Sequence, residues 1–480
     1  MAGSKTFWAT RVLFIFTIVY PLFLFPGALF SKPTSLFDAQ SQTVEMYQQL
    51  PKVVILLVAG LLGLLTFKPK TRNNPFLWLL LAHLVLVLAG CLNSRDEITF
   101  SILGPDRRMD GLLYQTGLVL FTLFVYEVVR RKPDAIRTLF LGLFWSGLIQ
   151  SILVLLQRFD LDVIGRLVSW NAFQAPVGSI GQPGMLAGLL LVSLLTGLWL
   201  YTVESNRQYQ WLLLAGIMLV AAATGMTTNR SVLLGLGIGL VGLNLNQRSW
   251  KILIVSCLSM LALFGANVGL NRFEQRKYAD PTTGTSRILF WKLALGNLLG
   301  IPGQPMIGGG PDAFRLSILR NPQVDKLLPI YRLEYGWPSN TKVAKAEITQ
   351  ERNAPLRSNS LTVTFDYYKT QKSLTLDYPL TLDKTHNMLL DRLLDYGGFS
   401  VLVWLLLYLF PTWRGFHNPN ALHSGVSWIS LGIFIYYLTW FPVIQVEPLH
   451  LLVVAVGWAL FTKEPVASNN LVQSPKAKTA

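Results

Sequence analysis

One histidine and two arginines are the residues of this 480-residue chain best suited to group-transfer chemistry. His386 lies in DKTHNMLLDRLLDYGGFS (383–400), at the start of an apolar helix. An imidazole titrates near neutral pH, and a helix N-terminus disfavours its cationic form, so His386 could accept a proton as a general base. The alternative is a structural histidine beside a helix cap formed by Thr385.

The two arginines each lie at the expected start of a helix. Arg230 follows polar residues in TGMTTNRS (224–231), and Arg287 precedes Trp291 by one turn in TSRILFW (285–291). A guanidinium group can bind phosphate through two parallel hydrogen bonds, and the positive end of a helix dipole favours the same anion. In isolation, either arginine also fits a contact with a lipid head group or with solvent.

Weaker candidates for substrate contact lie in other polar stretches. Arg107 and Arg108 in GPDRRMDG (104–111) fit a phosphate or a lipid head group equally well. Gly309 and Gly310 belong to a glycine run, which lets a backbone approach a ligand closely or turn sharply. Asn387 is the remaining candidate, because it directly follows His386.

The sequence shows no pattern typical of a metal site. Its two cysteines, Cys91 and Cys257, lie in separate apolar runs, and there is no H-E-x-x-H motif. We therefore expect no metal and no cofactor. A group-transfer reaction would then have to stabilise its leaving group with arginine charge.

Membrane-spanning helices must position these residues. The chain is 52% hydrophobic and only 14% charged, whereas soluble domains carry about 25% charged residues. We expect an all-α polytopic membrane protein with about 12 transmembrane helices. The expected spans are 10–30, 52–67, 74–93, 112–129, 137–157, 183–201, 210–225, 229–246, 250–270, 388–410, 424–442 and 446–462.

Charge predicts the orientation of these spans. With the N-terminus inside, alternate short loops such as FKPKTRNN and EVVRRKPDAIR are basic, while the opposite loops carry the acids. The positive-inside rule then places both termini in the cytoplasm. The net charge of +16 is explained in the same way, so we expect membrane lipids as partners and no nucleic acid.

This orientation divides the chain into four parts. Two membrane bundles, with about nine and about three spans, flank a large external loop with a helix at 285–300 and strands within 360–380. The parts are 1–270 (bundle), 271–385 (external loop), 386–462 (bundle) and 463–480 (cytoplasmic tail). Five polar stretches then reach the outer face: 104–111, 178–188, 224–231, 285–291 and the stretch with His386. Their convergence predicts one outward-facing site.

The order and spacing of these stretches resemble the O-antigen ligase and O-antigen polymerase superfamily of bacteria. KTHNMLLDRLLDYGGFSVLVWLLL is similar to its His-Asn signature, TTNRSVLLGL to its arginine-containing span, and TSRILFWKLAL with IPGQPMIGGGPDAF to its Arg-Trp helix and glycine turn. The resemblance covers residues of about 100–410. GSIGQPGMLAG departs from the usual Asn-Pro-Asn by having Gln182, Pro183 and Gly184.

The resemblance implies a metal-independent glycosyltransferase with a GT-C-like fold in the bacterial inner (plasma) membrane and a large periplasmic loop of mixed structure. Such an enzyme takes a glycan from an undecaprenyl-pyrophosphate-linked donor on the periplasmic face and inverts the anomeric centre. By resemblance, His386 would deprotonate the acceptor hydroxyl, and Arg230 and Arg287 would bind the pyrophosphate.

Three functions remain open at this stage. An O-antigen ligase would use lipid A-core as acceptor, whereas an O-antigen or exopolysaccharide polymerase would extend a lipid-linked repeat. The third alternative is a transporter of lipid-linked glycans, which would have a similar number of spans. Transporters often contain internal repeats and charged, broken helices near the midplane, and no repeat stands out in this sequence.

Overall fold

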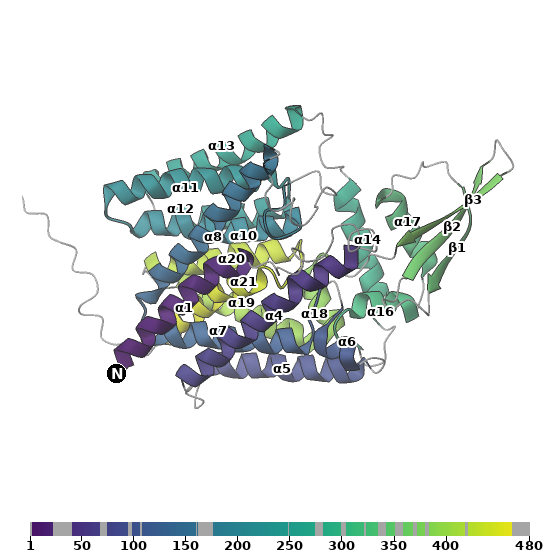
Figure 1. Cartoon of the computed structure of the whole chain (residues 1–480), viewed down its shortest axis with the longest axis horizontal. Coiled ribbons are helices and arrows are strands. Elements are labelled where there is room, and N and C mark those ends of the chain that lie inside the picture. Colours follow the sequence, from purple (N-terminus) through teal and green to yellow (C-terminus); the bar gives the residue numbers. More distant parts are fainter. Residues whose placement is uncertain are drawn as a thin grey trace, which may run out of the picture.

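The computed structural model describes residues 2–22, 41–67, 74–94, 98–105, 108–159, 161, 176–247, 249–273, 282–298, 304–320, 323–334, 342–350, 359–367, 372–379, 384–417 and 421–462. Within these ranges the chain is a mostly helical polytopic membrane protein. A bundle of long helices carries a smaller α/β segment at one end (Figure 1). The expected cytoplasmic tail (463–480) and the loop residue Arg107 lie outside the described ranges.

The bundle is built from helices that overlap every expected span. They are α1 (Ala2–Leu22), α4 (Ser41–Thr66), α5 (Pro75–Asn93), α7 (Leu112–Arg131), α8 (Ala135–Arg158), α10 (Pro183–Val203), α11 (Arg207–Met226), α12 (Ser231–Gln247), α13 (Trp250–Phe273), α19 (Gly398–Phe416), α20 (Ala421–Tyr437) and α21 (Glu447–Phe461). Among the described residues, eight helices are long and apolar enough to cross a membrane. The count of twelve spans therefore stays a prediction.

Local sequence explains where two of these helices begin. Pro183 is the first residue of α10, and the Gln182 side chain accepts a hydrogen bond from the Met185 amide. In the same way, Asn74 caps α5 ahead of Pro75. Proline suits this position because it has no amide hydrogen to leave unpaired and its backbone is preset for a helix.

Two expected spans differ from the helices of the structure: one is divided into two helices and the other ends earlier. The span expected at 388–410 is divided into α18 (Met388–Tyr396) and α19, because Gly397 adopts φ +81°. Glycine takes this left-handed conformation without a steric penalty and so ends a helix readily. The span expected at 424–442 ends at Tyr437, and Trp440 and Phe441 consequently lie in a loop.

The segment outside the bundle combines helices with a three-stranded sheet. Its elements are α14 (Thr282–Gly296), α15 (Gln304–Ile307), α16 (Ala313–Arg320), α17 (Val324–Glu334), β1 (Lys342–Gln350), β2 (Asn359–Tyr367) and β3 (Lys372–Pro379). The strands are antiparallel in the order β1-β2-β3, with Leu361 opposite Ile348 and Tyr378. The helix expected at 285–300 and the strands expected within 360–380 are present, whereas β1 was not expected from the sequence.

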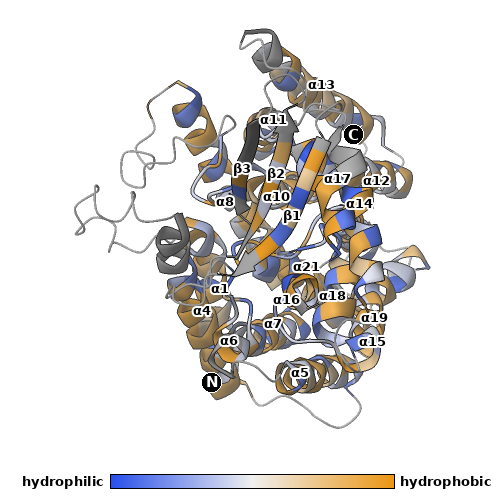
Figure 2. Cartoon of the chain, turned by 90° about the vertical axis from the view of Figure 1, so that its right-hand side faces the viewer, coloured by the Kyte–Doolittle hydropathy of each residue, from blue (hydrophilic) through white to orange (hydrophobic). Residues whose placement is uncertain are grey.

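Alternation along β2 gives the sheet one apolar face. Leu361, Val363 and Phe365 are buried in a small core with residues of α14, α16 and α17. The hydroxyls of Thr362 and Thr364 instead bond across to β3 on the exposed face. This alternation is what a sheet covered on one side requires. Figure 2 shows the sheet in front of the largely hydrophobic helices of the bundle.

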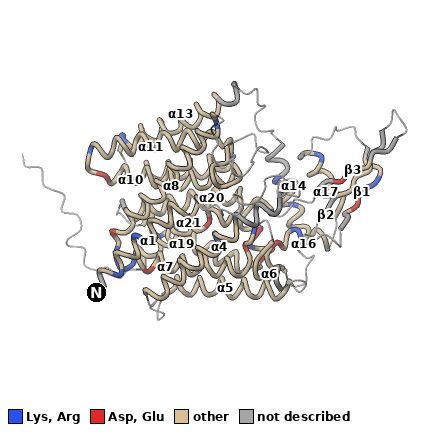
Figure 3. The backbone as a smooth tube through the Cα atoms, in the orientation of Figure 1, with Lys and Arg blue, Asp and Glu red and all other residues tan. Residues whose placement is uncertain are grey.

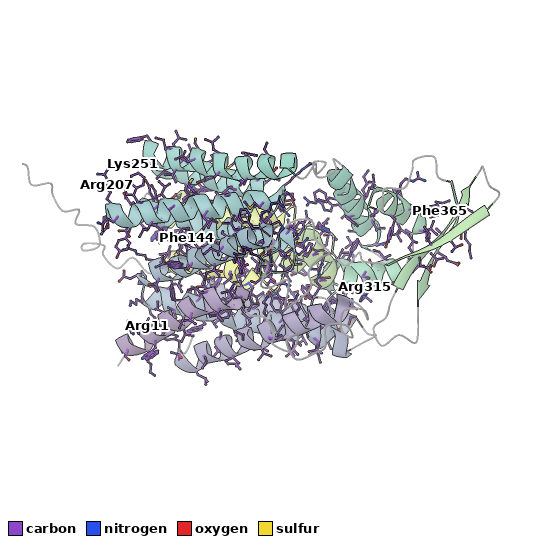
Figure 4. The ribbon with its side chains drawn as sticks, turned by 45° about the horizontal axis from the view of Figure 1, so that its top comes forward. Arg11, Phe144, Arg207, Lys251, Arg315 and Phe365 are labelled. Atoms are coloured by element: carbon purple, nitrogen blue, oxygen red, sulfur yellow. The ribbon has the colours of Figure 1, made fainter. Side chains whose placement is uncertain are left out.

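Charged residues gather toward the two ends of the molecule and leave the middle of the bundle mostly uncharged (Figure 3). Arg11, Arg207 and Lys251 lie at the end away from the α/β segment, whereas Arg315 and Phe365 lie in that segment (Figure 4). This distribution suits a bundle whose central band contacts hydrocarbon.

The glycine run packs backbone against backbone on α18. Gly309 and Gly310 donate their amides to the carbonyls of Leu394 and Asp395, at 2.8 and 2.9 Å. Gly308 has φ +84°, and a Cβ built there would lie 2.3 Å from the Asp395 carbonyl oxygen. The sharp turn and close approach therefore account for these glycines.

Replacement of Gly308 by alanine tests this packing. Gly308→Ala is expected to lower the free energy of unfolding by about 2–4 kcal/mol, through the left-handed backbone and the clash together. The measurement is thermal unfolding of the purified chain in detergent. Gly237→Ala is the matched control, because a Cβ built at Gly237 meets no described atom within 4 Å apart from its chain neighbours and the nearby backbone of its own helix. Equal stability of the two variants would contradict the packing argument.

Candidate functional site

His386 lies in a tight turn held by contacts on both sides. Its φ is +59°, a left-handed conformation that histidine adopts more readily than most residues but at a cost of about 1–3 kcal/mol. The Thr385 amide donates to Oδ1 of Asp391 at 2.8 Å, and the Thr385 carbonyl accepts from Nε1 of Trp291 at 3.1 Å. Strain of this kind persists only where the surroundings fix the backbone.

Asn387 caps α18. Its Oδ1 accepts hydrogen bonds from the amides of Leu389 and Leu390, at 3.0 and 3.2 Å. Thr385 was the cap expected from the sequence, and that expectation was wrong by two residues. The Asn387 amide group also donates to the Leu438 carbonyl at 2.9 Å, so it ties the turn to the loop after α20.

Three aromatic rings surround the His386 imidazole. Phe290 of α14 stacks on it, with ring centroids 5.6 Å apart. Trp440 and Phe441 approach edge-on at 5.3 and 5.0 Å. These two rings stack on each other, so the loop after α20 forms a rigid apolar wall at the imidazole. The wall restricts the approach to one side of the half-buried imidazole.

Arg287 and the start of α12 form a cationic group beside this wall. The Arg287 guanidinium lies 5.6 Å from the Trp440 ring and donates to the Ser231 hydroxyl at 3.0 Å. Burial lowers the pKa of Arg287, and the neighbouring charge of Arg230 acts in the same direction. Asn229 caps α12 by accepting from the amides of Ser231 and Val232. Two guanidinium groups at a helix N-terminus favour a phosphate-type anion.

The polar stretches expected at the outer face meet around Trp440 and Phe441. The Arg108 guanidinium lies 4.6 Å from the Phe441 ring. A Cβ built at Gly184 would lie 2.2 Å from the Trp440 ring, which places the start of α10 against the same wall. With Arg287 and His386, the stretches at 104–111, 178–188, 224–231, 285–291 and 383–400 all contribute contacts.

A buried ion cluster includes Lys384, which lies two residues before His386 in the same turn. Nζ of Lys384 lies 3.0 Å from Oδ2 of Asp110 and 3.0 Å from Oδ2 of Asp395. Asp395 also accepts the Ala313 amide at 3.1 Å. The two carboxylates hold the pKa of Lys384 well above its usual value, against the opposing effect of burial. The cluster therefore joins the loop before α7, the His386 turn, α18 and α16.

Asp391 is a third buried carboxyl near this lysine. Burial raises the pKa of Asp391 to about 7, with the charge of Lys384 acting in the opposite direction and Asp395 in the same direction. Because burial is the main cause, the Asp391 carboxyl carries a proton below about pH 7.

His450, in the first turn of α21, has both ring nitrogens engaged. Nδ1 lies 2.6 Å from the Tyr437 hydroxyl, and Nε2 lies 2.9 Å from the Gly188 carbonyl. Since the carbonyl can only accept, Nε2 donates and Nδ1 accepts. The residue is fully buried, so it does not compete with His386 as a general base.

Of the expected site residues, the structure brings together His386, Arg287, Arg108 and Asn387, with exposed Arg230 next to Ser231. Gly309 and Gly310 are buried against α18, with their amides engaged by its carbonyls, and Arg107 is not described. The sequence reading missed Trp440, Phe441 and Phe290. Pro442 was the available signal, because the residues before a proline disfavour helix and so mark a loop.

Positive φ values gather at the same end of the bundle. Among the described residues other than glycine, they occur at Met109, Thr228, Asp312 and His386. These residues lie in the loops that precede α7, α12, α16 and α18. Backbone strain of this kind clusters at functional sites, so its distribution supports a site here.

The raised pKa of Asp391 generates a prediction for stability. Its folded pKa of about 7 exceeds the ordinary value of 3.8, so the stability that it contributes is present below that value and lost as pH rises through 7. Asp391→Asn avoids this loss. The variant should be more stable than wild type at about pH 8.5, by on the order of 2 kcal/mol, with a smaller advantage at about pH 5.

Thermal unfolding at the two pH values measures this difference. Asp377→Asn is the matched control for removal of a carboxyl group, since Asp377 is exposed on β3. An Asp391→Asn advantage that does not change with pH would show that the carboxyl is already ionised.

No protein-family model matches the chain, and no curated protein and no solved structure shows significant similarity to it. A functional proposal consequently depends on the geometry of the site and on the sequence motifs described above.

Proposed function

We propose that this protein is a glycosyltransferase of the O-antigen ligase type in the bacterial inner membrane. It would transfer a glycan from undecaprenyl pyrophosphate to a hydroxyl group of lipid A-core. In this proposal the chain spans the membrane about 12 times, both termini lie in the cytoplasm, and the end of the bundle with His386 faces the periplasm.

One observation carries the proposal: His386 and Arg287 contact the same indole ring, Trp440. The imidazole and the guanidinium thus lie on one indole, at 5.3 and 5.6 Å from its ring. Arg230 lies beside them at the N-terminus of α12. A glycosyl pyrophosphate requires this pairing, because its leaving group is anionic while its acceptor must lose a proton.

The reaction would be a single displacement. The acceptor oxygen attacks the anomeric carbon as the imidazole of His386 takes the hydroxyl proton. The bond from this carbon to the pyrophosphate oxygen breaks on the opposite face, and the electron pair leaves with the pyrophosphate. Arg287 and Arg230 stabilise the charge that develops there. Because attack and departure take place on opposite faces, the anomeric centre is inverted.

The acceptor separates a ligase from a polymerase. The same site would serve a polymerase if the hydroxyl belonged to another lipid-linked repeat. We assign recognition of the acceptor to the segment at 315–380, which contains α17 and the sheet and adjoins the site through α14.

Removal of the imidazole tests the general-base role. His386→Ala is expected to lower glycan transfer by about 10²–10⁴-fold. The measurement uses purified protein in detergent with a lipid-linked donor, where transport across a membrane cannot contribute. His417→Ala is the control, since His417 is an exposed histidine at the other end of α19. Wild-type activity in folded His386→Ala would contradict the role, and transport of the donor without transfer would favour a transporter.

Arg287→Lys tests the binding of the leaving group. Lysine keeps the charge but loses the planar fork that binds phosphate at two points. We expect the KM for the donor to rise about tenfold while the dependence on the acceptor is unchanged. An unchanged donor KM and an unchanged kcat would show that Arg287 does not contact the pyrophosphate.

Chelation tests the metal-independent mechanism. Because two arginines are proposed to stabilise the leaving group, EDTA should leave the rate of glycan transfer unchanged. Initial rates before and after exhaustive chelation provide the measurement. Strong inhibition that is reversed by a divalent cation would contradict the proposal.

A further inference from the structure

The turn that carries His386 is held by a carboxyl group to which the proposed reaction assigns no role. Oδ1 of Asp391 accepts the Thr385 amide at 2.8 Å. Its other oxygen, Oδ2, is buried and has no hydrogen-bond partner among the described residues. The whole residue is only 4% exposed. A buried carboxyl with one oxygen left unpartnered needs an explanation.

Helix capping does not explain Asp391. The first amides of α18, those of Leu389 and Leu390, are already bonded to the Asn387 side chain. Asp391 instead reaches back past this cap to the amide of Thr385, the residue immediately before His386. Its hydrogen bonding to Thr385 therefore serves the turn.

Ion pairing does not explain Asp391 either. Lys384 lies 3.0 Å from Asp110 and 3.0 Å from Asp395, and these two carboxylates already exceed its single positive charge. A third carboxylate at this place is disfavoured mainly by its burial, which raises the pKa of Asp391. A neutral residue would avoid this cost, so ion pairing alone gives no reason for an acid here.

The strained backbone of His386 explains why a carboxyl group is present at position 391. Its φ of +59° is maintained by the bond from Trp291 to the Thr385 carbonyl, by the bond from Asn387 to the Leu438 carbonyl, and by Asp391. The first two contacts come from the α14 side and the α20 side. Asp391 supplies the contact from α18 itself, so it fixes the turn relative to the helix that follows.

We propose that Asp391 is a positioning residue, which orients the imidazole of His386 by holding the Thr385 amide. The kinetic consequence rests on the function proposed above, whereas the structural contact does not. A base that shifts by about 1 Å can lose about 100-fold in rate, because proton transfer requires hydrogen-bond geometry. The role requires only an oxygen acceptor at the Oδ1 position, with or without charge.

Two variants of similar size separate the effect of a hydrogen-bond acceptor at position 391 from the effect of side-chain volume. Asp391→Asn keeps an oxygen that can accept the Thr385 amide, whereas Asp391→Leu fills the same space without an acceptor. We expect Asp391→Asn to retain kcat within about threefold, and Asp391→Leu to lose about 30- to 100-fold in kcat. The KM for the donor should change little in both variants, because the proposed donor contacts are Arg230 and Arg287. Asp377→Asn, on the exposed face of β3, is the control for removal of a carboxyl group.

Hydrogen exchange of the full-length protein gives a readout that is independent of activity. Amides at 384–387 should exchange faster in Asp391→Leu than in wild type, and at the wild-type rate in Asp391→Asn. Asp391→Ala provides the same comparison if the leucine variant fails to fold.

Two outcomes would overturn the inference. The first is wild-type kcat and wild-type exchange at 384–387 in the folded variants that lack an acceptor. The second is complete loss of transfer in folded Asp391→Asn, which would show that the charged carboxylate itself is needed. A wild-type protein that transfers no glycan would instead contradict the proposed function, and the exchange data would still test the contact.

Discussion

The candidate site depends on the buried ion cluster of Lys384, Asp110 and Asp395. Lys384 lies in the turn before α18, Asp110 lies in the loop before α7, and Asp395 lies in the last turn of α18. Asp395 also bonds to the first residue of α16. Removing such charges from water costs several kcal/mol per ion, and this cost is offset only when the partners meet in good geometry. The cluster therefore stabilises one arrangement of these elements and disfavours others.

The site is assembled from both parts of the molecule. Leu394 of α18 belongs to the core of the α/β segment, while Met388 of the same helix belongs to the core of the bundle. α14 contributes Arg287, Phe290 and Trp291 from the outer segment to the His386 turn. The cationic group is consequently complete only where the outer segment packs on the bundle.

The aromatic wall of Trp440 and Phe441 sets the distances between the polar groups. Its rings contact the imidazole of His386 and the guanidinium groups of Arg108 and Arg287. The rings keep water from part of the surface of each group. Apolar surroundings strengthen the interaction of a guanidinium group with an anion, because less water competes for it. The wall also packs between the imidazole and the guanidinium groups, so these groups keep their separation without a direct bond.

The sequence by itself determined the class of fold and the candidates for chemistry. Hydrophobic runs predicted the long helices, and alternation predicted β2 and β3, since both patterns are local and repeat with the period of the element. Chain position singled out His386, Arg287 and Arg230, because each lies at a helix start next to polar residues. Only the tertiary structure decided that Asn387 caps α18, that Gly397 divides an apolar run into two helices, and that the glycine run packs on α18. It alone revealed Trp440 and Phe441, which local hydrophobicity had assigned to a span. Contacts between residues far apart in the chain, such as Lys384 with Asp110, depend on how helices pack and leave no periodic signal in the sequence.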